Sequence, residues 1–131
     1  MYNNFSNDIA VSIATIFEER IITIEYDTFM WEYTISVTNK SDKYIRLKLA
    51  EFSFVNEFGD TNQVEVHEFN DNNVVLAPGS IIKKQGVIYS HNSSSIVFGK
   101  IFAFDELDKE FSAIIPTFSL DSPYFFYKTV Q

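Results

Sequence analysis

The chain has 131 residues, of which 17% are aromatic, with no cysteine and a formal net charge of −8. This length suits one domain, in which folding hides roughly two-thirds of the surface of the unfolded chain. The absence of cysteine excludes disulfides and thiolate metal sites, and the acidic balance argues against nucleic acid as a direct partner, because that needs a basic face.

The N-terminal residues lack a basic segment followed by an apolar stretch. No apolar run reaches the ~20 residues that a membrane-spanning helix requires. We therefore expect no signal peptide, no membrane partner and a cytoplasmic location.

Apolar side chains recur with a period of two along most of the chain, and no segment sustains a period of 3.6. The first pattern is typical of half-buried strands, and many short strands favour an antiparallel sandwich or barrel. We expect strands over residues 9–17, 29–37, 45–54, 63–67, 81–89, 96–104 and 111–120, and residues 74–76 are a short apolar run.

Three of these segments carry a further signal. The apolar parity flips after Leu49, so a bulge or break is expected near Ala50 and Glu51. Residues 96–104 are nearly all apolar, which predicts an inner strand. Pro116 cannot donate a ladder hydrogen bond, so the last strand should be an edge or contain a bulge.

The order of several short motifs resembles the bacterial ApaG family. Residues 31–39, Trp-Glu-Tyr-Thr-Ile-Ser-Val-Thr-Asn, are similar to the family's aromatic-x-Tyr-x-Ile-x-Ile-x-Asn strand. Residues 76–79 match its Leu-x-Pro-Gly turn, and residues 115–120 match its closing Ile-Pro-x-Phe-x-Leu strand. The remaining matches are Gly59, Gly86, Gly99 and Pro123, and the resemblance runs from about Ile9 to Pro123.

This resemblance implies an all-β fold, a fibronectin type III or immunoglobulin-like antiparallel β-sandwich of about seven to eight strands. The expected organisation is a flexible N-terminal extension (residues 1–7), the sandwich (residues 8–123) and an aromatic C-terminal tail (residues 124–131). The family is associated with cobalt resistance and magnesium efflux, without an established reaction. We therefore expect a non-enzymatic binding or interaction domain linked to divalent cation homeostasis.

The chain departs from the family at its glycine-rich Gly-x-Gly-x-x-Gly loop. The three glycine positions are occupied by Val66, Glu68 and Asp71, of which two are acidic and would repel phosphate. We therefore expect pyrophosphate binding to be lost here. The alternative function is direct metal binding, or nucleotide binding and hydrolysis, through this loop; the candidate ligand-binding residues are Val66, His67, Glu68, Asn70 and Asp71.

His67, Glu68 and Asp71 are also weak candidate metal ligands, since nitrogen and oxygen donors suit divalent transition metals. Neighbouring strand residues point to opposite faces, so one of His67 and Glu68 would have to turn back. A solvated acidic loop is the competing interpretation. No cofactor is predicted, and binding of a divalent metal remains an open alternative.

No catalytic residues are assigned. The acidic residues between 105 and 110 lack the spacing of a calcium loop, and a polar hairpin turn explains them better. His91 and the serines that follow it have no orienting carboxylate nearby in the sequence, so we expect a plain turn.

The consecutive aromatic residues after the last strand have two readings. They cover an edge of the sandwich, or they bind a protein partner or a second copy of the chain. The candidate partner-binding residues are Tyr124, Phe125, Phe126 and Tyr127.

Overall fold

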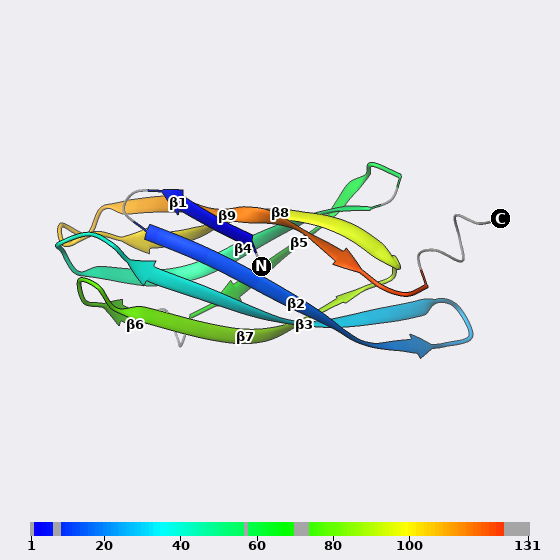
Figure 1. Cartoon of the computed structure of the whole chain (residues 1–131). Coiled ribbons are helices and arrows are strands. Elements are labelled where there is room, and N and C mark those ends of the chain that lie inside the picture. Colours follow the sequence, from blue (N-terminus) through cyan, green and yellow to red (C-terminus); the bar gives the residue numbers. More distant parts are fainter. Residues whose placement is uncertain (1, 7–8, 57, 70–73, 125–131) are drawn as a thin grey trace.

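The alternating segments fold into antiparallel β-strands (Figure 1), seen in a computed structural model that describes residues 2–6, 9–56, 58–69 and 74–124. No helix in these residues is long and apolar enough to cross a bilayer. The strands are β1 (Tyr2–Ser6), β2 (Ile9–Ile22), β3 (Asp27–Asn39), β4 (Ile45–Asn56), β5 (Thr61–Glu68), β6 (Val74–Leu76), β7 (Ile81–Ser90), β8 (Ser94–Phe104) and β9 (Glu110–Asp121).

Two sheets face each other. The first has the order β1-β2-β3-β7, and the second has the order β5-β4-β8-β9, with β6 also paired to β4. All strand pairs are antiparallel. The predicted all-β sandwich of fibronectin type III-like architecture is confirmed, with β2, β3 and β7 facing β5, β4, β8 and β9.

The core lies between the sheets and follows directly from the alternation. In β3 every odd residue from Phe29 to Asn39 is buried, and the even residues are half-buried. The largest fully buried side chains include Trp31, Tyr33, Phe52 and Phe118. Burying large rings on both inner faces supplies much of the apolar area that stabilises a domain of this size.

The predicted phase change in β4 is present, two residues earlier than expected. Leu47 is buried, and the next buried residues are Ala50 and Phe52. The pairing with β8 shifts register between Leu47 and Leu49. Leu49 is only half-buried, so the bulge precedes it and the residues after it keep the new parity.

The predictions for β8 and β9 are also confirmed. β8 lies between β4 and β9, and β9 is an edge strand. The register between them shifts at Val97 and Gly99, opposite Pro116. This bulge accommodates a residue that cannot donate to the ladder.

The N-terminus differs from expectation. Residues 2–6, expected as part of a flexible extension, form β1, which pairs with the outer edge of β2 from Tyr2–Ile13 to Ser6–Ile9. With β1, the described residues form nine strands, where seven or eight were expected. Its pairing covers what would otherwise be an open sheet edge.

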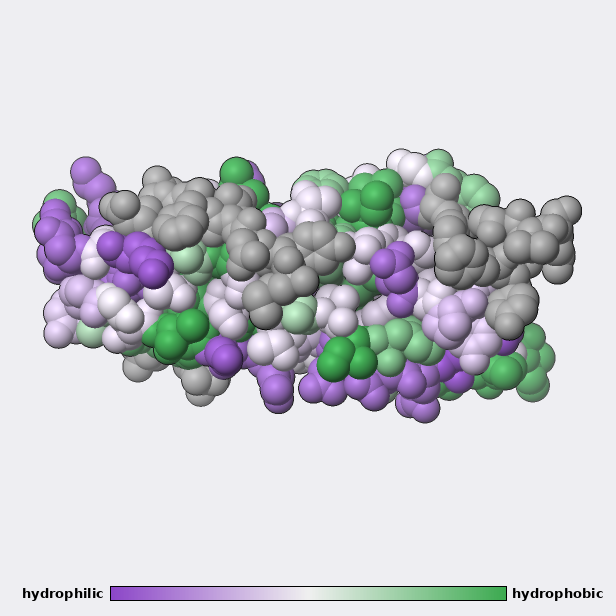
Figure 2. Space-filling view, in the orientation of Figure 1, coloured by the Kyte–Doolittle hydropathy of each residue, from purple (hydrophilic) through white to green (hydrophobic). Residues whose placement is uncertain are grey.

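The β2–β3 hairpin extends past the sandwich, close to the end of β9 (Figure 1). Apolar side chains gather at its tip, where Ile22 is 71% exposed and Ile24 is fully exposed. Figure 2 shows this tip as one of several separate apolar patches on the face of the molecule that is turned to the viewer.

Candidate functional site

Residues 66–68, the first part of the predicted 66–73 loop, belong to strand β5. This strand turns the His67 side chain toward the sandwich. It pairs with β4 so that His67 lies opposite Ala50 and Glu65 lies opposite Phe52. Ala50 and Phe52 are buried core residues. The expected alternation in β5 is confirmed: Glu65 and His67 share the inner face, whereas Val64 and Val66 are 60% and 55% exposed.

His67 contacts a polar partner at each ring nitrogen. Its Nδ1 atom lies 2.7 Å from the hydroxyl oxygen of Tyr33, and its Nε2 atom lies 3.2 Å from Oε1 of Glu65. The imidazole also packs edge-on against the rings of Tyr33 and Phe52. With a neutral imidazole, Tyr33 donates to Nδ1 and Nε2–H donates to Glu65, so all three groups are satisfied.

The phenol of Tyr33 is held in its neutral form. Burial raises the pKa of Tyr33 to about 12, and the negative charge of Glu65 adds to this effect. Gly86 lies opposite Tyr33 on β7. A Cβ atom at Gly86 would lie only 2.4 Å from the Tyr33 hydroxyl oxygen, so the glycine makes room for the ring.

The predicted ligand set is only partly placed. Glu68 is exposed and faces away from His67, as expected for neighbouring strand residues. Asn70 and Asp71 lie outside the described residues. Among the residues that are described, no three His, Cys, Asp or Glu side chains gather closely enough to hold a metal. The metal site therefore stays a prediction.

Sequence reasoning missed the two partners of His67, which are Tyr33 and Glu65. The spacing of Glu65 and His67 by two residues was the available signal, because it places both side chains on one face of a strand. The contact with Tyr33 joins strands from different sheets, and no local pattern reveals it. The other histidine, His91, instead contacts Tyr26 and Thr28 in the β2–β3 segment.

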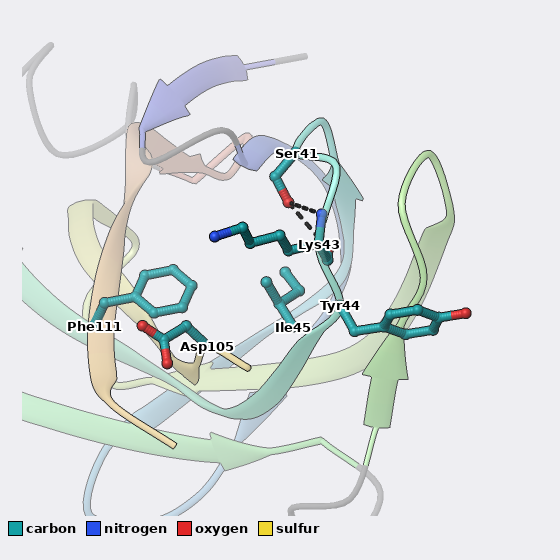
Figure 3. Close-up of a pocket in the computed structure, with 6 residues that line it drawn as sticks. All are labelled: Ser41, Lys43, Tyr44, Ile45, Asp105 and Phe111. Atoms are coloured by element: carbon teal, nitrogen blue, oxygen red, sulfur yellow. Dashed lines mark hydrogen bonds between the residues drawn. The ribbon is translucent and has the colours of Figure 1, made fainter. Parts of the chain in front are cut away.

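A cavity of about 290 Å³ opens at the end of the sandwich where the β3–β4 loop meets the β8–β9 turn. Its volume is just below the range of about 300–1,000 Å³ that is usual for small-molecule sites. It is lined by Ser41, Lys43, Tyr44, Ile45, Asp105 and Phe111 (Figure 3).

Buried Asn39, at the end of β3, holds the β3–β4 loop in place. Its Nδ2 atom donates to the carbonyls of Lys43 and Leu76, at 2.7 and 3.1 Å. Its Oδ1 atom accepts from the backbone N–H of Ser41. Because Gly79 N–H also donates to the Asn39 carbonyl, the loop and the β6–β7 turn form one hydrogen-bonded unit.

The β8–β9 turn is fixed by Asp105, whose Oδ1 atom accepts from the backbone N–H groups of Leu107 and Lys109. The carboxylate of Glu106 reaches across to the other loop and accepts from the N–H of Tyr44 at 3.1 Å. The predicted polar hairpin turn is therefore present, and its acidic groups tie the cavity walls together.

The ammonium group of Lys43 has no ion-pair partner within the described residues. In Figure 3 its side chain extends across the cavity opening toward Phe111 and Asp105, whereas Tyr44 points the opposite way. Ile45 is buried and Phe111 half-buried. The cavity thus presents the Lys43 cation above the apolar side chains of Ile45 and Phe111, and the Asp105 carboxylate also lines it. Sequence reasoning singled out neither Lys43 nor Phe111.

The aromatic tail is described only at its first residue. Tyr124 packs on the core side of the β2–β3 segment, against Phe17 and Phe29. The guanidinium of Arg20 lies 4.8 Å from the Tyr124 ring centroid. Phe125, Phe126 and Tyr127 lie outside the described residues, so their partner-binding role stays a prediction.

The chain is similar in sequence to several proteins named ApaG, although no family model matches it. The ApaG proteins of Methylocella silvestris and Beijerinckia indica are each 27% identical to it over 124 residues, which is 95% of this chain and 95% of each relative. The ApaG protein of Bradyrhizobium diazoefficiens is 25% identical over 123 residues.

Solved structures show the same fold. An X-ray structure of a structural genomics target superposes with a TM-score of 0.81 at 20% identity, covering 89% of both chains. A Bordetella pertussis protein provisionally named ApaA gives a TM-score of 0.72 at 16% identity, covering 88% of this chain and 94% of its own. The resemblance to the ApaG family is thus confirmed: the chain is ApaG-like in sequence over 95% of its length.

Proposed function

We propose that this chain is a cytoplasmic, non-enzymatic binding domain of ApaG type. Its ligand is a small molecule with one anionic group on an apolar body, bound in the cavity between the β3–β4 loop and the β8–β9 turn. The observation that carries the proposal is the Lys43 ammonium, which lies over a floor formed by Ile45 and Phe111.

The hydrogen bonds of the cavity walls favour binding. Asn39 fixes one loop and Asp105 the other, and Glu106 links the two. A preformed site loses less conformational entropy when a ligand arrives. Recognition on loops carried by a rigid scaffold is also the usual arrangement in sandwich domains.

The absence of catalysis in this proposal is supported by Tyr33. Glu65, His67 and Tyr33 have the order of a carboxylate–imidazole–hydroxyl relay. However, a pKa of about 12 keeps the Tyr33 phenol protonated at neutral pH. The relay therefore fits a structural link between the sheets better than an activated nucleophile.

The family resemblance supports, as part of this proposal, a role in divalent cation homeostasis. In this proposal the role depends on binding of the small molecule, and the chain itself binds no cation. The alternative, a metal or nucleotide site in the 66–73 loop, is less well supported, because both ring nitrogens of His67 already contact Tyr33 and Glu65.

Titration of ¹⁵N-labelled protein with phenylacetate, followed by NMR, tests the proposal. This probe has a carboxylate for Lys43 and a ring for the apolar floor. We expect shifts at Ser41, Lys43 and Phe111, with a dissociation constant on the order of 1 mM, as suits a ligand of this size. Lys43→Met should weaken binding about tenfold, the range expected for one charge-assisted hydrogen bond.

Lys83→Met is the matched control, because Lys83 is exposed on β7. It should leave the affinity unchanged. Shifts that avoid the cavity, or equal affinities for wild type and Lys43→Met, would contradict the proposal. Pyrophosphate lacks an apolar part and should not bind at micromolar concentration; micromolar affinity would overturn the argument from the replaced loop glycines.

A further inference from the structure

The outer face of the β5-β4-β8-β9 sheet exposes apolar side chains on three strands. Val64 and Val66 on β5 are more than half exposed, as is Ile114 on β9. Ile96 and Phe98 on β8 are 52% and 43% exposed. Apolar side chains gathered on one face in this way mark an interaction surface.

Strand register places three adjacent rows of side chains across this face, next to a further row formed by Glu68, Leu49, Phe102 and Ser112. Cross-strand partners point to the same side of a sheet, so each row is a line of neighbouring side chains. The rows are Val66–Glu51–Lys100–Ile114 in the centre, Val64–Ser53–Phe98 on one side of it and Val55–Ile96–Ser119 beyond that.

From either end, the central row reads apolar, charged, charged, apolar, and its two charges have opposite signs. Two copies of this face can be related by a twofold axis that lies between them, parallel to the strands and midway between β4 and β8. It lays β4 of one copy over β8 of the other, and β5 over β9. Glu51 then faces Lys100 of the second copy, Lys100 faces its Glu51, and Val66 faces its Ile114.

The other two rows are also self-complementary about this axis. The large ring of Phe98 faces the small Ser53 of the second copy, and Val55 faces Ile96. Bulky residues opposite small ones let two sheet faces interdigitate, as they do inside a sandwich. A twofold contact of this kind uses one patch on both copies.

The two central charges are available for such pairing. Although Glu51 and Lys100 are cross-strand neighbours, they form no ion pair with each other or with another side chain in the described part of the protein. We propose that the outer face of the β5-β4-β8-β9 sheet is the interface of a symmetric homodimer, specified by Glu51–Lys100 pairs between copies. This surface is separate from the ligand cavity.

The dimer is expected to be weak. Four strands at a spacing of about 4.8 Å make a face only about 14 Å across between the outer strand axes. A standard interface buries about 800 Å² per partner, and smaller ones belong to transient complexes. A dissociation constant of tens of micromolar, about 6 kcal/mol of binding free energy, is the corresponding expectation.

Sedimentation equilibrium of the full chain, between about 1 µM and about 500 µM, tests this interface. The wild type should pass from monomer to dimer within this range. Lys100→Glu and Glu51→Lys should each weaken the dimer at least tenfold, because each places like charges opposite one another twice per interface. Combining both substitutions should restore the affinity to within about threefold, since the pair is only reversed. Lys83→Glu, with the same charge change outside the face, should have no effect.

Circular dichroism of each variant shows whether it is folded, and Phe98→Ser provides a second, charge-neutral disruption of the contact. Three results would overturn the proposal. The first is a wild type that remains a monomer at the highest concentration. The second is a double charge reversal that fails to restore association. The third is loss of the dimer on deletion of residues 125–131, in which case the aromatic tail forms the contact instead.

Discussion

The hydroxyl of Tyr33 lies 2.7 Å from Nδ1 of His67, and this contact joins the two sheets of the sandwich. Tyr33 is in β3, between β2 and β7, whereas His67 is in the edge strand β5 of the other sheet. Tyr33 is buried, and the rings of Phe52 and His67 pack against it. The edge strand is therefore held onto the core by a polar link inside an aromatic cluster.

Tyr33→Phe should lower the free energy of unfolding by about 1–2 kcal/mol. The substitution keeps the ring but leaves Nδ1 of the partly buried His67 without its hydrogen bond. Urea unfolding measures the change. Tyr44→Phe is the control, because Tyr44 is 56% exposed, and it should cost almost nothing. Equal stabilities of the two variants would show that the Tyr33 hydroxyl has no structural role.

The same tyrosine predicts a loss of stability at alkaline pH. The pKa of Tyr33 is about 12 in the folded protein and about 10 in the unfolded chain. The group therefore contributes its full stability below pH 10, and that stability declines as the pH rises toward 12, by about 1.4 kcal/mol per pH unit. The difference between wild type and Tyr33→Phe, measured by urea unfolding from pH 8 to 12, isolates this contribution. A difference that does not change with pH would contradict the account.

The two strand glycines should differ in their tolerance of alanine. A Cβ atom at Gly99 would lie 1.9 Å from the backbone carbonyl oxygen of Glu51, whereas at Gly86 it would meet only the Tyr33 side chain. Because backbone yields less than a side chain, Gly99→Ala should cost about 3 kcal/mol or more, and Gly86→Ala less. Thermal unfolding of both variants gives the order, and the reverse order would refute the argument.

Neither cobalt nor magnesium should give a binding heat in calorimetric titration of the metal-free chain. A metal at His67 would have to displace Tyr33 or Glu65 from a ring nitrogen. The double variant His67→Ala, Asp71→Ala serves as the comparison. A saturable heat in the wild type that is absent from this variant would establish the metal site that we argue against.

The strands were predictable from the sequence because burial on one face imposes a period of two. The bulge in β4 was predictable in kind but not in position. Leu49 is apolar yet only half-buried, and hydropathy does not distinguish such a residue from a core one. The location of β1 depended on which edge remained free for pairing, which is a property of the assembled sheet.

The candidate site was harder to predict, because its contacts join segments distant in sequence. His67 was identified as an unusual residue, but its partners Tyr33 and Glu65 emerge only once β5 docks on the sandwich. Asn39 is the last residue of the 31–39 motif. That motif does not reveal that Asn39 hydrogen-bonds both the β3–β4 loop and the β6–β7 turn. Lys43 sits in a polar turn, where nothing local marks a lysine that overhangs a cavity.

Intermolecular nuclear Overhauser effects between phenylacetate and the protein test the central claim most directly. A ligand in the cavity must bring its ring within about 5 Å of the side chains of Ile45 and Phe111, the range of apolar contact with some allowance for motion. We predict contacts from the ligand ring to these two residues, and their loss in Lys43→Met at the same ligand concentration. Contacts to residues outside the cavity, with none to Ile45 or Phe111, would contradict the proposed binding function.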